Sequence, residues 1–430
     1  MAKRWNGPTC PPEPAAAAMS QPAPPPASDA NRYRWWILAI ATATQLAAAL
    51  ASQGIGAWAP HAQQALQFSN RDLGLLATLL NGAAAAALLL VGPMLDRFGE
   101  RLPVFLGMAV MGVALLVLGD AAHYATLALA MLIAGLGYSP IQPAGGKAIY
   151  QWFPPRERGL AMGIRQAALP MGGACAAAFF PFMIGHAGWH AAMLAAASIL
   201  VAAGLIYLTL FRCALGPCAR PRHTAHHAPA ALPRQTSLRR LGIVGMAMVG
   251  VQTVISVFWA LLVHHRFGLS THAAAWHLFA LQLGGAAGRL AISAISDHLH
   301  DGRRRMVRLC ALMTGCALLT AIALPTRGHD AMMLACSVAI GVFGFGWYGP
   351  WVVWLSDCAG PRQIGRVLAS ALAANQLIIA AVPLAFGALL DALPDPAPGW
   401  LALAGLLAVA MRYSGMPETG ATESGPSPPR

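Results

Sequence analysis

Three cationic side chains stand inside long apolar segments of this chain of 430 residues: Lys147, Arg165 and Arg289. An arginine or lysine at the centre of a membrane-spanning helix costs about 2.5–3.5 kcal/mol on insertion scales, so each of the three needs a partner. None of the fifteen acidic residues falls near the middle of an apolar segment. We therefore expect the three cations to use backbone carbonyls, water or an anion supplied from outside.

Depth along the helix separates the three cations. Lys147 and Arg165 each lie about six residues, or about 9 Å, from a predicted helix end, so both side chains can extend to the membrane surface. Arg289 lies about 12 Å from the end of its segment at Asp297 by the same rise per residue. Ligand binding and a structural role are both open for Lys147 and Arg165, whereas ligand binding is favoured for Arg289.

Neutral polar residues in the apolar segments can either orient a ligand or join two helices by a hydrogen bond worth about 0.6 kcal/mol. There are seven candidates: Gln45, Asn81, Gln142, Gln252, Gln282, Asn375 and Gln376. We predict that Gln282 and Asn375 complete a substrate site with the three cations. The sequence contains no Ser/His/Asp cluster, metal-ligand spacing or phosphate-binding loop, so we expect no enzyme activity, no cofactor and no metal.

The apolar segments are long enough to cross a bilayer as helices. Hydrophobic residues make up 57% of the chain and charged residues only 10%, whereas soluble domains carry about 25% charged residues. Runs of roughly 20 apolar residues predict twelve spans, at about 35–58, 73–95, 102–119, 125–150, 159–183, 190–211, 241–263, 273–296, 306–324, 331–355, 367–390 and 399–413. The twelfth is short, because Arg412 follows soon after its first apolar residues.

The basic residues predict the orientation of the spans. If both termini are cytoplasmic, 22 lysines and arginines fall on the cytoplasmic side and three on the other, at 71, 266 and 327. This asymmetry is typical of an integral protein with cytoplasmic termini, here expected in the plasma (inner) membrane of a bacterium. The formal net charge of +13 therefore reflects topology in a lipid bilayer, and we expect no nucleic-acid partner.

A faint internal repeat divides the chain. GLGYSP at 135–140 is similar to GFGWYGP at 344–350, and PRERG at 155–159 is similar to PRQIG at 361–365. We therefore predict two six-helix halves, with the site between them. The predicted divisions are a disordered tail 1–32 in which Met1 or Met19 can be the start, a half 33–211, a linker 212–240, a half 241–413 and a tail 414–430.

The segment after the second predicted span carries a known signature. Residues 92–101 read GPMLDRFGER and match each fixed position of G-x-x-x-D-R-x-G-x-R, namely Gly92, Asp96, Arg97, Gly99 and Arg101. Over residues 33–413 the chain thus resembles the major facilitator superfamily. The resemblance implies an all-α fold of two six-helix pseudo-repeats that rock about a central site.

The resemblance also implies a role for these residues. Asp96, Arg97 and Arg101 would latch the cytoplasmic ends of the two halves in the outward-open state, and Gly92 would allow close helix contact. Asp297 is the counterpart of Asp96 in the second half, although its next residue is histidine and not arginine.

Arg289 carries a second likeness. The segment 288–297 resembles the G-R-x-x-x-G-x-x-x-D pattern of monocarboxylate and oxalate–formate type members, although Ser293 and Ala294 depart from it. In those members the arginine is associated with a substrate carboxylate. By contrast, LPMGG at 169–173 matches only poorly the fifth-helix motif of proton-coupled drug exporters, which favours a packing role for these residues.

We therefore predict a secondary active transporter for a small organic anion such as a monocarboxylate. An exporter of drugs or other hydrophobic compounds is the alternative, and a membrane sensor that binds its ligand without transport is a third possibility. Co-transport of a proton and exchange of anions both stay open as the mode of coupling.

Overall fold

The computed structural model describes residues 27–154, 157–211, 235–299, 301–325, 329–359 and 364–415. The predictions for the N-terminal tail before residue 27, for most of the linker and for the C-terminal tail after residue 415 lie outside these residues. Within them the chain forms fourteen α-helices and no β-strand, which confirms the predicted all-α fold.

The helices fall into two sets in chain order. The first set is α1 (Ala27–Gln53), α2 (Ile55–Leu66), α3 (Asn70–Phe98), α4 (Arg101–Gly119), α5 (Tyr124–Tyr138), α6 (Ile141–Trp152) and α7 (Arg158–Leu210). The second set is α8 (Gln235–Phe267), α9 (Thr271–His298), α10 (Gly302–Ala323), α11 (Asp330–Gly346), α12 (Tyr348–Ala359), α13 (Ile364–Ala392) and α14 (Ala397–Gly415).

Three predicted spans are broken helices. The break between α1 and α2 is at Gly54, the one between α5 and α6 is at Ser139 and Pro140, and the one between α11 and α12 is at Trp347. Pro140 precedes α6 because proline has no backbone N–H to donate to the preceding turn. Conversely, α7 holds two predicted spans, which meet at Gly188, where a φ of 84° requires glycine.

Length and composition agree with the predicted spans. Within the described residues, ten helical stretches are long and apolar enough to cross a membrane, and one of these, Leu160–Leu210, contains the two spans that meet at Gly188. Helix α14 is as long as α4 but is not among the ten, and it has Arg412 in its last turn. The predicted weakness of the twelfth span is therefore also present in the structure.

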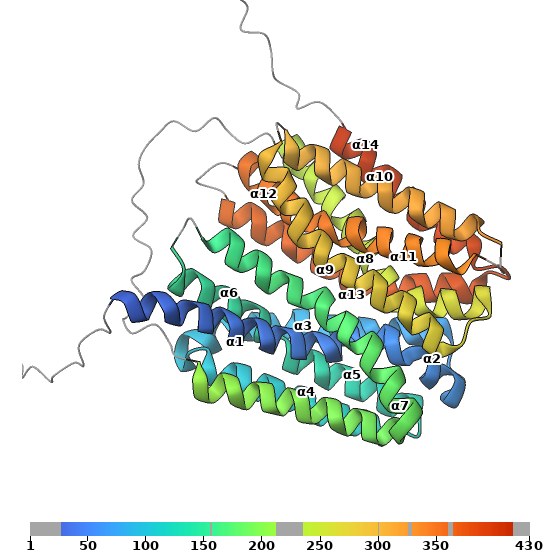
Figure 1. Cartoon of the computed structure of the whole chain (residues 1–430), viewed down its shortest axis with the longest axis horizontal. Helices are drawn as coiled ribbons and strands as arrows, with labels where there is room; N and C mark the ends of the chain where they lie inside the picture. Colours follow the sequence, from blue (N-terminus) through green and yellow to red (C-terminus); the bar gives the residue numbers. More distant parts are fainter. Residues whose placement is uncertain are drawn as a thin grey trace, which may run out of the picture.

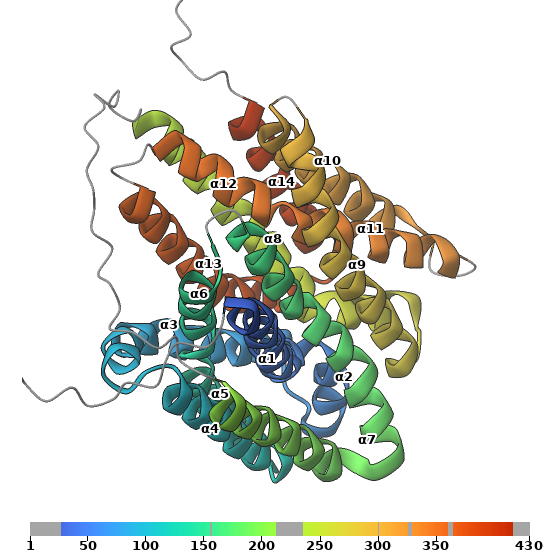
Figure 2. The ribbon, with the colours of Figure 1, turned by 60° about the vertical axis from the view of Figure 1, so that its left-hand side comes forward.

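The helices α1–α7 form one group and α8–α14 a second group beside it (Figures 1 and 2). One end of the bundle, here called the motif end, holds the turn between α3 and α4 at Gly99. The start of α1 lies at the same end, since Arg34 pairs with Glu157 in the turn before α7 at 2.9 Å. The opposite end holds the last turn of α13 with Asp391, and we call it the Asp391 end.

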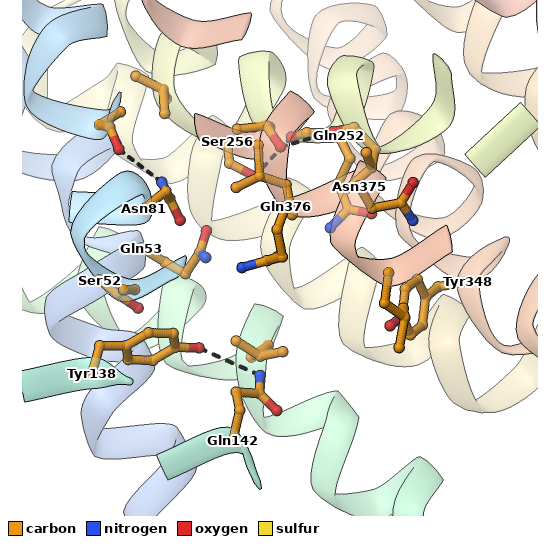
Figure 3. A pocket seen from close by; sticks show the side chains of 18 of the residues that line it. Ser52, Gln53, Asn81, Tyr138, Gln142, Gln252, Ser256, Tyr348, Asn375 and Gln376 are labelled. Carbon is orange, nitrogen blue, oxygen red and sulfur yellow. Dashed lines mark hydrogen bonds between the residues drawn. The ribbon is translucent and has the colours of Figure 1, made fainter. Parts of the chain in front are cut away.

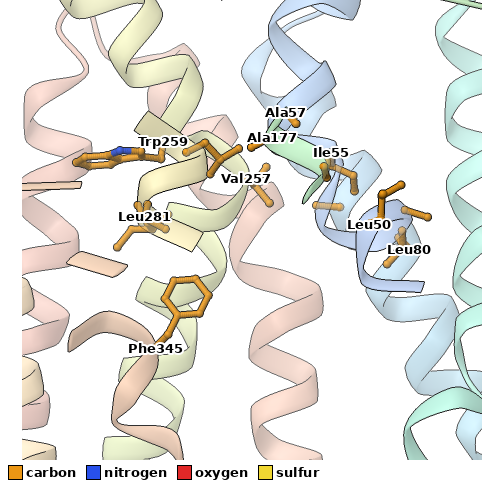
Figure 4. Close-up of a cluster of buried hydrophobic side chains, with 14 of the residues drawn as sticks. Leu50, Ile55, Ala57, Leu80, Ala177, Val257, Trp259, Leu281 and Phe345 are labelled. Carbon is orange, nitrogen blue, oxygen red and sulfur yellow. The ribbon is translucent and has the colours of Figure 1, made fainter. Parts of the chain in front are cut away.

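The two groups meet along α3 with α13 and along α7 with α9. Backbones approach closely there: a Cβ on Gly74 would lie 2.2 Å from the carbonyl oxygen of Pro383, and one on Gly387 would lie 2.1 Å from that of Asn70. Buried apolar side chains of both groups also form one cluster, which includes Ala57, Ala177 and Val257 (Figure 4). Small residues thus let the two groups touch on the Asp391 side of the bundle centre.

Candidate functional site

A cavity of about 330 Å³ lies between the two groups of helices (Figure 3). Along α3 it is lined by Ala77, Asn81, Ala84 and Leu88, which are spaced by three or four residues and so share one face of the helix. This face runs from the middle of α3 toward the motif end. The cavity therefore lies on the motif-end side of the close contact between α3 and α13.

Carboxamide side chains dominate the polar lining. Seven of them come from both groups: Gln53, Asn81, Gln142, Gln166, Gln252, Asn375 and Gln376. Among the described residues that line the cavity, the single charged side chain is Arg289. Five of the seven neutral residues predicted from the sequence are thus cavity residues, and the predicted Asn375 is one of them.

Arg289, on α9, is only partly satisfied. Its Nη1 donates a hydrogen bond of 3.1 Å to the backbone carbonyl of Gln166 in the other group, and its guanidinium lies 5.4 Å from the ring centroid of Tyr348. The side chain is only 9% exposed, and its Nε is buried without a hydrogen-bond partner among the described residues. A buried cation held by one carbonyl and one aromatic face retains donors for an anion.

Arg165, on α7, is enclosed by acceptors of its own group. Its Nη2 donates to Oε1 of Gln45 and to the carbonyls of Ile141 and Gln142, each at 2.9 Å, and its Nη1 donates to Oε1 of Gln142 at 3.3 Å. The guanidinium packs on Gly145, where a Cβ would lie 2.2 Å from Nε. The side chain is 2% exposed and does not line the cavity.

Lys147, on α6, corrects a sequence expectation. Its Nζ lies 3.5 Å from Oε1 of Glu100 and donates to the carbonyl of Leu95 at 3.2 Å. The expectation that it has no carboxylate partner was therefore wrong, because Glu100 folds back from the turn after α3 and is itself buried. Lys147 lies toward the motif end and does not line the cavity.

Gln282 lies outside the cavity as well. Its amide packs on Gly173 of α7, where a Cβ would lie 2.7 Å from Cδ, and the side chain is 0% exposed. Neither amide atom has a hydrogen-bond partner in the described part of the chain. Gly172 packs in the same way on α1, where a Cβ would lie 2.6 Å from the carbonyl oxygen of Leu46. Both glycines of the segment 169–173 thus serve helix packing.

Among the cavity residues that were not predicted from the sequence, four have long polar or aromatic side chains: Gln53, Gln166, Tyr138 and Tyr348. Gln53 is the last residue of α1, and Gln166 follows Arg165. At such positions hydropathy does not single out a polar residue as a candidate for ligand binding. Tyr138 accepts hydrogen bonds from Gln45 and Gln142 at 3.3 and 3.4 Å, whereas Tyr348 lies under Arg289. The two tyrosines had a detectable signal, since each precedes the proline of the repeated segment by two residues.

Comparison with known proteins decides the family. The family model described as Major Facilitator Superfamily matches residues 41–383, with a further match to 241–428. The chain belongs to the major facilitator superfamily. It is therefore an integral membrane transporter of small-molecule solutes and not an enzyme.

Relatives cover the chain to different extents. An uncharacterised MFS-type transporter of Mycobacterium tuberculosis strain H37Rv is 28% identical over 88% of this chain and 83% of that protein. A probable L-galactonate transporter of Escherichia coli K12 is 32% identical, over 30% of this chain and 28% of that protein. The crystal structure of a bacterial homologue of the human lysosomal transporter Spinster, inward-facing and occupied, shares the fold with a TM-score of 0.70, 17% identity and coverage of 89% and 96% of the two chains.

The signature residues of this MFS transporter bind within their own group of helices. Arg101 donates to the carbonyl of Leu208 on α7, and Arg97 lies over the ring of Phe98 at 5.3 Å. Gly99 ends α3 with a φ of 71°, which explains the glycine at this position. The side chain of Asp96 lies outside the described part of the structure. The latch between the halves therefore stays a prediction.

Two further signature residues differ in their surroundings. A Cβ on Gly92 would meet no described residue within 4 Å, so the expected close helix contact is absent from the described part of this conformation. Oδ1 of Asp297 lies 4.0 Å from Nη2 of Arg303, and Arg303 also pairs with Asp357. These contacts join α9, α10 and α12 within the second group and do not reach the first.

At the opposite end, Asp391 joins the two groups of helices. Its Oδ1 accepts hydrogen bonds from the backbone N–H and the side-chain amide of Asn70 at 3.1 and 2.8 Å, and its Oδ2 accepts from the backbone N–H of Arg71 at 2.7 Å. Those N–H groups belong to the first turn of α3, whose positive end favours a carboxylate. The last turn of α13 thus caps α3 across the boundary between the groups.

Proposed function

We propose that this MFS transporter carries a small organic anion, in the simplest case a monocarboxylate, and that Arg289 binds its carboxylate. The observation that carries the proposal is the incomplete hydrogen bonding of this guanidinium inside an otherwise uncharged cavity lining. A carboxylate offers two acceptor oxygens that fit the fork of guanidinium donors. Placing an anion beside Arg289 would also offset the cost of burying its charge.

The position of Arg289 suggests how binding is linked to movement. Arg289 belongs to the second group of helices and donates to a carbonyl of the first group, on Gln166. A carboxylate on Arg289 competes with this contact and so changes the attraction between the groups. We infer that the groups α1–α7 and α8–α14 rock about the cavity, with the motif end facing the cytoplasm as the basic residues predict.

A sequence relative supports the choice of an anion. The probable L-galactonate transporter of Escherichia coli is named for a carboxylate, and it matches this chain over about a third of its length. The rival is an exporter of hydrophobic compounds. Seven carboxamides are a poor lining for an apolar solute, because a polar group buried without a hydrogen-bond partner costs about 1–3 kcal/mol.

The test is uptake of radiolabelled carboxylates into proteoliposomes that contain the full chain. We expect saturable uptake of at least one anion, loss of uptake in Arg289→Gln, and a reduction in Arg289→Lys, which keeps the charge but not the planar fork. Arg308→Gln, at an exposed position of α10, is the matched control and should transport normally. Runs with an imposed pH gradient, or with the anion preloaded inside, distinguish proton co-transport from exchange.

Unchanged uptake in both Arg289 variants would contradict the role of Arg289. Uptake of lipophilic compounds with no uptake of any carboxylate would favour the rival exporter. Saturable ligand binding with no flux of any tested compound would instead favour a sensor.

A further inference from the structure

Four cavity amides have no hydrogen-bond partner on their side chains among the described residues: Gln53, Gln166, Asn375 and Gln376. The remaining three are occupied. Asn81 donates to the carbonyl of Ala77, Gln142 donates to Tyr138, and Gln252 accepts from the indole N–H of Trp347 at 3.2 Å. The cavity therefore holds a set of free donors and acceptors in addition to the cation.

Asn375 is the most constrained of the four. It is 3% exposed, lies on α13 and has both its Nδ2 and its Oδ1 buried without a partner. Buried amides are normally bonded, so an amide with both ends free beside a cavity indicates a missing partner. An alkyl chain in the cavity would leave it unpaired, whereas a hydroxyl can both accept from Nδ2 and donate to Oδ1.

The four amides come from both groups of helices. Gln53 and Gln166 belong to the first group, on α1 and α7, and Asn375 and Gln376 are neighbours on α13 of the second. Figure 3 shows Gln53 and Gln376 extending into the same space from opposite sides. A ligand with hydroxyls along its length can therefore bond to both groups at once.

We propose that the anion is a hydroxylated carboxylate of the sugar-acid type, whose hydroxyls bind these four amides. The inference rests on the proposed function, since Arg289 takes the carboxylate. A volume of about 330 Å³ falls within the range of small-molecule sites, about 300–1,000 Å³, and suits a chain of several carbons. Sites built to bond a hydroxyl discriminate strongly against analogues that lack it, because their polar groups are then left unpaired.

The test compares two six-carbon anions, gluconate and hexanoate, in equilibrium binding to the purified full-length protein. Both carry one carboxylate, and only gluconate carries hydroxyls. We expect gluconate to bind at least about tenfold more tightly, since one neutral hydrogen bond is worth up to about tenfold in affinity and several are available.

Variants locate the selectivity in the cavity. Gln376→Leu and Asn375→Leu should each weaken gluconate binding by about three- to tenfold and leave hexanoate binding unchanged or tighter. Gln376 is partly exposed, so its replacement does not depend on repacking a buried site. Leu377→Ala, on the same helix but 71% exposed, is the matched control and should change neither affinity.

The outcomes separate this inference from the proposed function. Equal affinity for gluconate and hexanoate, or equal loss of both in the leucine variants, would overturn the hydroxylated substrate and leave the anion site standing. Absence of binding for every carboxylate tested would overturn the anion proposal itself, and this inference with it.

Discussion

Arg165 and Arg289 are both buried arginines in apolar helices, and neither has a carboxylate partner among the described residues, but they are held in opposite ways. Arg165 donates to four oxygens of its own group of helices and is shut off from the cavity. Arg289 donates to one carbonyl of the other group and lines the cavity. Nε is buried without a described partner in both side chains, so the difference lies in the other nitrogens and in access to the cavity. A cation with four internal hydrogen bonds holds helices together, whereas one with a single hydrogen bond in a cavity lining is suited to a ligand.

The largest expected effect separates the two arginines by stability. Arg165→Gln leaves up to four acceptor contacts without their donor, each worth about 1–3 kcal/mol if the acceptor stays buried and unpaired. We expect a marked loss of thermal stability in detergent for Arg165→Gln and a small change for Arg289→Gln. Equal losses in unfolding temperature would show that both arginines are structural.

The aromatic partner of Arg289 provides a second way to sharpen the comparison. Tyr348→Leu removes the ring under the guanidinium, and a cation–π contact worth about 0.5–2 kcal/mol predicts anion binding weaker by about two- to thirtyfold. Tyr348→Phe keeps the ring and should keep the affinity. For Tyr138→Leu and Tyr138→Phe we expect no such difference, because both substitutions remove the hydroxyl that accepts hydrogen bonds from Gln45 and Gln142.

Titration of a labelled carboxylate against each tyrosine variant measures these effects. If Tyr348→Leu bound the anion as the unmodified protein does, the ring would have no part in holding Arg289.

The smallest expected effect concerns the Asp391 end. Asp391→Asn removes the negative charge that faces the start of α3. The interaction of such a charge with a helix N-terminus is worth about 0.3–1 kcal/mol. We expect the two groups to separate at this end in part of the molecules. Spin labels at exposed positions 65 and 272, on α2 and α9, should then show a longer distance component. An unchanged distance distribution would mean that the charge of Asp391 is not needed to keep this end closed.

The sequence was sufficient for the fold because long apolar runs, basic turns and the 92–101 signature act locally along the chain. The breaks at Gly54 and Trp347 were not predicted, since a helix that resumes after one residue keeps its apolar composition. Depth singled out Arg289, and the structure places it in the cavity lining, whereas its role in ligand binding stays a prediction. For Lys147 depth left both roles open, and the expectation that failed was the absence of a carboxylate partner, because Glu100 comes from a turn that folds back.

The rotation of each helix about its axis could not be predicted from the sequence. Gln282 and Arg289 lie two turns apart on α9, yet one packs on Gly173 and the other lines the cavity. Arg165 and Gln166 are neighbours on α7, and only Gln166 reaches the cavity. Such choices depend on which neighbouring helix lies opposite, and small residues such as Gly145 and Gly173 decide that through packing.

Equilibrium binding of labelled gluconate to the purified protein tests the central claim most directly, with Arg289→Gln and Arg308→Gln compared at one ionic strength. The account predicts that Arg289→Gln loses at least about tenfold in affinity while it stays folded, since a hydrogen bond to a charged group is worth about 1.5–3 kcal/mol, and that Arg308→Gln binds normally. Gluconate affinity that is unchanged in folded Arg289→Gln would contradict it.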